Sequence, residues 1–168
     1  MNIFIDEAGV FVIPSHKMWS VSCVGAIVIP EEDTKDVLSG FEQLKSQWRV
    51  EGKEIKGSKL NESEVSSLIS FLKQFDVIFQ VTTIDMAMQS TSGITKHRLK
   101  LADLMLKNTT ECHPNLIKQL ENIKEQIQQL SNQLYVQACC TIDLMYTVLQ
   151  NATLYYAQRK PKELSEFY

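Results

Sequence analysis

The sequence predicts an α/β protein whose first half is rich in strands and whose second half is entirely helical. Residues 1–90 contain runs of β-branched and aromatic residues, separated by polar segments with helical spacing. Residues 94–158 show helical spacing throughout. At 168 residues and 44% hydrophobic content, the chain is long enough for one domain with its own core. We expect an α/β core over residues 1–90 and a helical insertion or extension over 91–168.

Three strands are expected before the first helix. "NIFID" at the N-terminus reads as a strand, and "GVFVI" after the glycine reads as its partner through a tight turn. "WSVSCVGAIVIP" is longer and rich in valine and isoleucine, and it ends at Pro30. The predicted sheet therefore begins with strands that follow each other closely in the chain.

Two helices and a further strand complete the first half. A helix is expected over residues 31–48, which begin with acidic residues and carry apolar side chains at helical spacing. Asn61 begins a second helix that runs to about Phe75, with Glu64 at the position of a capping box. "DVIFQVTTIDM" is the last predicted strand, and its final apolar residue is followed directly by Asp85.

The second half carries two heptad seams, which favour packed helices. The seams can pack on each other as an antiparallel helical pair, or they can form a surface for a homodimer or another protein partner. Their members are Leu116, Leu120, Ile123, Ile127, Leu130 and Leu134 in the first, and Ala138, Ile142, Met145, Leu149, Ala152 and Tyr156 in the second.

Composition favours a cytoplasmic protein with no membrane association. The chain has a net charge of −3 and no N-terminal basic segment followed by an apolar stretch. Its longest apolar run is too short to span a bilayer. The four cysteines show no CxxC spacing and are expected to be free thiols, and the neighbours Cys139 and Cys140 suit packing better than metal chelation.

Carboxylates follow two of the predicted strands. Asp6 and Glu7 come directly after an apolar strand, and Asp85 comes directly after another. Carboxylates brought together at strand ends repel each other unless a cation lies between them, and Mg²⁺ prefers oxygen ligands. Such clusters commonly hold divalent ions that drive phosphodiester cleavage. An aspartate at the end of a strand can also cap a turn, and for Asp85 that interpretation stays open.

Basic residues accompany a further acid in the loop "EGKEIKGSKL". Glu54 lies between lysines, with Lys56 beside it, as expected for a metal ligand flanked by groups that neutralise phosphate. A solvated polar loop has the same composition. The clusters "KHRLK" from Lys96 and "RKPK" from Arg159 could likewise contact a nucleic-acid backbone or form ordinary surface.

Three segments resemble a bacterial family catalogued as a domain of unknown function, number three thousand eight hundred. They are "FIDEAG", "VGAIVI" and "EIKGSKL". The hallmark of that family is an Asp-Glu-Ser-Gly motif, and the chain has Ala8 where the family usually has serine. The resemblance implies an RNase H-like mixed-sheet core, with Asp6 as the first catalytic carboxylate, Glu54 as the second and Asp85 as a less clear third. The segment "QRKPKELSEFY" resembles a point inside the family, before a further strand and a closing helix that carry acids.

These observations predict a divalent-metal-dependent nuclease that hydrolyses phosphodiester bonds in DNA or RNA. Asp6, Glu54 and Asp85 would bind Mg²⁺ or Mn²⁺, and Lys56 would hold phosphate. The acids that the family carries further on would be missing from this site. The alternative is a non-catalytic RNase H-like module that dimerises or binds a protein partner through its helices.

Overall fold

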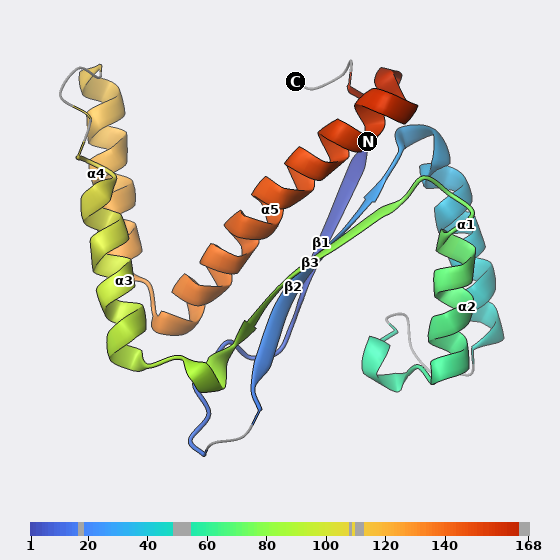
Figure 1. Cartoon of the computed structure of the whole chain (residues 1–168), viewed down its shortest axis with the longest axis horizontal. Helices are drawn as coiled ribbons and strands as arrows, with labels where there is room; N and C mark the ends of the chain where they lie inside the picture. Colours follow the sequence, from blue (N-terminus) through green and yellow to red (C-terminus); the bar gives the residue numbers. More distant parts are fainter. Residues whose placement is uncertain (17–18, 49–54, 108, 110–112, 165–168) are drawn as a thin grey trace. The chain divides into compact units, whose positions relative to one another are not determined.

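The computed structural model describes residues 1–16, 19–48, 55–107, 109 and 113–164. Within them the protein is a mixed α/β structure with a three-stranded antiparallel sheet and a mostly helical C-terminal part. The strands are β1 (Asn2–Ala8), β2 (Val21–Ile29) and β3 (Ile78–Asp85), and β2 is the central strand of the sheet (Figure 1). Because β1 and β3 both run antiparallel to β2, their C-terminal ends lie at the same end of the sheet.

The expected strand "GVFVI" is not formed, so that prediction is wrong. Residues 9–13 have no strand structure. Gly9 and Phe11 both have positive φ angles, 99° and 50°, which turn the chain out of an extended course. The Phe11 side chain is buried, and its backbone N–H donates to Ser22 Oγ at 3.0 Å. An apolar run can therefore be buried in a loop as well as in a strand.

The first two helices form as expected. Helix α1 (Glu31–Gln47) carries three acidic residues in its first turn, which suit the positive end of the helix dipole. In α2 (Glu62–Leu72), Asn61 and Glu64 form a capping box, with hydrogen bonds of 3.0 and 2.8 Å. The two helices pack on each other, and a Cβ added to Gly40 would lie 2.3 Å from the Phe71 ring. The absence of a side chain at Gly40 lets them approach.

The helical pairing differs from the expected one. Helix α4 (Pro114–Gln129) packs along α3 (Thr91–Leu104), rather than forming the expected pair with residues 138–156. Lys124 forms a 2.9 Å ion pair with Asp103, and Arg98 donates to the carbonyl of Leu130. A residue later in α3 therefore pairs with a residue earlier in the segment of α4, so the two helices are antiparallel.

Helix α5 (Asn132–Arg159) buries a stripe of side chains at every fourth position. Its members are Val136, Cys140, Leu144, Val148, Ala152 and Tyr156. Only Ala152 and Tyr156 also belong to the predicted second seam. Ile142, another member of that seam, is 68% exposed, so an intramolecular role for it is wrong. A role for it in binding a second copy stays a prediction.

By its internal contacts, the chain divides into two compact units. Unit 1 comprises residues 1–5, 26–80 and 148–168, and unit 2 comprises residues 6–25 and 81–147. The predicted division between residues 90 and 91 stays a prediction. In the described part of the chain, no helix has the length and apolar character needed to cross a membrane.

Candidate functional site

Asp6 and Asp85 lie at the same end of the sheet, on its two outer strands. Asp6 is the third residue from the C-terminal end of β1 and is exposed, whereas Asp85 is the last residue of β3 and is half-buried. Both belong to unit 2. Strands two places apart in a sheet are separated by roughly 10 Å, so carboxylates on them can share ions only if both side chains reach toward the central strand.

Asp85 also has a structural role in its own turn. Its Oδ1 accepts a 2.9 Å hydrogen bond from the backbone N–H of Ala87, at the start of the 3₁₀ helix η2 (Met86–Met88). The backbone N–H of Met86 donates to the carbonyl of Ser20 at 2.7 Å. These bonds fix the backbone beside Asp85, and they agree with the interpretation of Asp85 as a turn cap. One carboxylate oxygen can cap the turn while the other remains able to accept a ligand.

The other predicted acid, Glu54, lies outside the described residues. Lys56 is exposed and comes just before the 3₁₀ helix η1 (Gly57–Lys59), in unit 1. Among the described residues, no group of three or more histidine, cysteine, aspartate or glutamate side chains could hold a metal ion. Asp6 and Asp85 are hard oxygen donors of the kind that Mg²⁺ and Mn²⁺ prefer. Asp6 and Asp85 are thus donors of a suitable kind, and their role as metal ligands stays a prediction.

The C-terminal basic cluster serves the fold of unit 1. Lys160 Nζ lies 2.6 Å from Glu32 Oε1, 2.9 Å from Asp33 Oδ2 and 3.6 Å from Asp76 Oδ2. Hydrogen bonding to Glu32, followed by that to Asp33, raises the pKa of Lys160 against the opposing effect of burial. An ammonium group with three carboxylate partners is poorly placed to bind phosphate. In the other cluster, Lys96 and Lys100 are exposed on α3.

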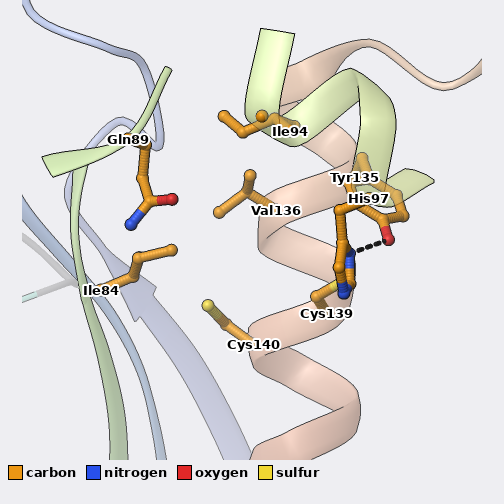
Figure 2. Close-up of a pocket in the computed structure, with 9 residues that line it drawn as sticks. Ile84, Gln89, Ile94, His97, Tyr135, Val136, Cys139 and Cys140 are labelled. Carbon is orange, nitrogen blue, oxygen red and sulfur yellow. Dashed lines mark hydrogen bonds between the residues drawn. The ribbon is translucent and has the colours of Figure 1, made fainter. Parts of the chain in front are cut away.

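A cavity in unit 2 is a site that the sequence analysis missed. Its volume is about 420 Å³, and no lysine, arginine, aspartate or glutamate lines it. In Figure 2, Gln89 and Ile84 of the β3 side face Val136 and Cys140 of α5 across the cavity. The lining also includes Gly93, Ile94 and His97 of α3, and Tyr135 and Cys139 of α5. The cavity needs three elements that are distant in sequence, so no local pattern could have revealed it.

A hydrogen-bonded pair forms one polar side of the cavity. His97 Nδ1 and the Tyr135 hydroxyl lie 2.7 Å apart, as the dashed line in Figure 2 shows. Burial raises the pKa of Tyr135, and hydrogen bonding with Cys139 raises it further. Burial also raises the pKa of the Cys140 thiol. Tyr135 and Cys140 are therefore neutral at physiological pH, and neither adds a charge to the lining of the cavity.

Comparisons with known proteins give no family for the chain. No family model matches the sequence, and neither a curated protein nor a solved structure is significantly similar to it. A function for the protein therefore has to be inferred from its own residues.

Proposed function

We propose that the protein is a divalent-metal-dependent nuclease with an RNase H-like core that hydrolyses phosphodiester bonds in DNA or RNA. The observation that carries the proposal is the position of Asp6 and Asp85 at one end of the sheet. Rigid strands that end beside loops are common supports for catalytic groups. The resemblance to the bacterial family implies Glu54 as a further ligand and Lys56 as a phosphate-binding group, and these two roles stay predictions.

In this proposal Asp6 and Asp85 hold Mg²⁺ or Mn²⁺ through their carboxylate oxygens. The bound ions would supply the Lewis acidity that activates water and stabilises charge on the phosphate. Asp85 is fixed by its turn, because Ala87 donates to one of its oxygens. Asp6 lies on an edge strand and is exposed, so substrate can approach it from solvent.

The experiment compares the parent protein with Asp6→Asn and with Asp36→Asn, a control at an exposed position of α1. Each is melted with and without millimolar Mn²⁺ and assayed on single- and double-stranded DNA and RNA. Mn²⁺ should raise the melting temperature of the parent and the control but not of Asp6→Asn, because a ligand stabilises only the state that binds it. Cleavage should be lost in Asp6→Asn alone. A parent protein that neither binds Mn²⁺ nor cleaves any of the four substrates would contradict the proposal.

A second function is favoured by the exposed side of α5. Ile142 and Tyr146 are each 68% exposed, and Leu149 lies on the same side of the helix one turn further on. Apolar side chains at this spacing are typical of a helix that binds another helix. The protein would then be a non-catalytic module that dimerises or binds a protein partner. Light scattering on Ile142→Asp tests this function, because a dimer of the parent should become a monomer.

A further inference from the structure

The cavity between β3, α3 and α5 has the dimensions of a small-molecule site. Its volume of about 420 Å³ lies within the range of roughly 300–1,000 Å³ that is typical of ligand pockets. The residues that line it come from a strand end, a turn and two helices. Regular elements hold most of these side chains, so the cavity is a formed feature of unit 2.

The lining selects an uncharged ligand. Neither a lysine, an arginine nor a carboxylate lines the cavity. A charged ligand would lose its hydration there without gaining a partner of opposite charge, which is costly. Ile84, Ile94 and Val136 instead offer aliphatic surface on different sides of the space, as Figure 2 shows. Such surfaces suit the two faces of a flat ring, which can be desolvated at little cost.

Gln89 supplies a hydrogen-bonding group on the wall of the cavity. Its side-chain amide has one acceptor oxygen and a nitrogen donor, and the one hydrogen bond found for it is a long contact of 3.5 Å to the carbonyl of Asp85. His97 Nδ1 and the Tyr135 hydroxyl already pair with each other. The amide therefore keeps both an acceptor and a donor with which it can bind a ligand. A glutamine amide pairs with adenine through its N6 amino group and N7, one donor and one acceptor side by side.

We propose that this cavity binds an adenine base, supplied either by a free nucleoside or by a single strand of nucleic acid. The ring lies among Ile84, Ile94 and Val136, and its N6 and N7 edge pairs with Gln89. The single-strand source rests on the proposed nuclease function, because Gln89 follows Asp85 by four residues and contacts its carbonyl. Binding of a free nucleoside does not depend on that function.

The Cys139 thiol reports whether the cavity is occupied. Cys139 lines the cavity and is partly exposed, whereas Cys23 is a cysteine on β2 that does not line it. The protein is treated with N-ethylmaleimide in the presence of increasing adenosine, and modification of each cysteine is read by peptide mass spectrometry. A short oligo(dA) strand replaces adenosine in a second series. Adenosine should slow modification of Cys139 and leave that of Cys23 unchanged.

Two protein variants and one altered nucleoside sharpen the test. Gln89→Leu should raise the adenosine concentration needed for protection by about tenfold or more, the usual effect of one lost bidentate pair. Gln126→Leu makes the same change on the exposed surface of α4 and should behave as the parent. Inosine carries an acceptor in place of the N6 donor, so it should protect Cys139 of the parent less well than adenosine does. In Gln89→Leu the two nucleosides should protect Cys139 equally poorly.

Protection by adenosine alone identifies a site for the free nucleoside, and protection by both probes identifies a site for single strands. The proposal is overturned if neither probe protects Cys139, or if Gln89→Leu is protected as well as the parent. Asp6→Asn separates this proposal from the nuclease function. It should lose Mn²⁺-dependent cleavage and retain adenosine protection, so either proposal can fail without the other.

Discussion

The hydroxyl of Tyr156 lies 2.8 Å from the backbone carbonyl of Asp76, and the whole tyrosine side chain is buried. The same hydroxyl is 3.4 Å from the carbonyl of Val28 on the central strand. Burial is the main cause that raises the pKa of Tyr156, so the hydroxyl stays neutral and donates. One side chain near the end of α5 thus connects that helix to the residues before β3 and to β2 within unit 1.

Tyr156→Phe should lower the free energy of unfolding by about 1–2 kcal/mol, because it leaves the part-buried carbonyl of Asp76 without this donor. The ring and its packing are retained, so the loss reports the hydrogen bond. Urea denaturation monitored by circular dichroism measures the change. Tyr146→Phe removes the hydroxyl from an exposed tyrosine of the same helix and should leave the midpoint unchanged. Equal midpoints for all three proteins would show that the Tyr156 hydroxyl contributes nothing.

Asp76 should make the stability of unit 1 depend on pH in acid. Its Oδ1 accepts a 2.9 Å hydrogen bond from the Tyr155 hydroxyl, which is the largest cause that lowers the pKa of Asp76 from its usual 3.8. A lowered folded-state pKa gives stability that is complete above the unfolded value and is lost as the pH falls through the folded value. Stability should therefore decline below about pH 4 in the parent, and less steeply in Asp76→Asn.

Tyr155→Phe provides the check on this cause. Removing the hydroxyl should raise the pKa of Asp76, measured by NMR titration of its carboxyl carbon, while Lys160 and Arg159 still favour the ionised form. Asp36→Asn, at an exposed position of α1, is the matched control for the acid melts. The explanation fails if the pKa of Asp76 is the same in the parent and in Tyr155→Phe.

Gly9→Ala should destabilise the protein by about 1–3 kcal/mol, because the position has a positive φ of 99° that L side chains rarely adopt. An added Cβ would also lie 2.6 Å from Ser22 Oγ and 2.8 Å from Ser22 Cα. Gly57→Ala is the control, since a Cβ there meets no atom within 4 Å. Thermal melts of the two variants should differ clearly, and a Gly9→Ala protein as stable as Gly57→Ala would contradict the described turn.

Local patterns predicted those elements in which neighbouring residues decide the structure. The capping box of Asn61 and Glu64 is confirmed, because both of its partners lie within one turn of the chain. The strand ending at Asp85 is confirmed for a similar reason. The loop at Phe11 was missed because its buried side chain and its bond to Ser22 depend on tertiary contacts. The spacing of apolar residues predicted that the second half is helical, but it did not predict that α4 packs on α3.

The candidate site residues also differ in whether a local sequence pattern reveals them. Asp6 and Asp85 could be singled out as candidates because an acid after an apolar run is a local signal, although β1 continues past Asp6 to Ala8. Their position at one end of the sheet follows from the strand order, which the sequence does not specify. The cavity at Gln89 requires β3, α3 and α5 together, and its polar residues are scattered along some fifty positions of ordinary helix and turn. No spacing rule groups such residues.

The two tryptophans of the chain differ in exposure, which makes one of them a fluorescent reporter of unit 1. Trp19, in unit 2, is 91% exposed, whereas Trp48, in unit 1, is 8% exposed and lies edge-on to the Phe41 ring. An ionic quencher such as iodide reaches a solvent-exposed indole and is excluded from a buried one. Emission that survives iodide therefore comes from Trp48, and the quenched part comes from Trp19. The opening of unit 1 can therefore be followed, in one unlabelled sample, as the emission of Trp48 becomes accessible to iodide.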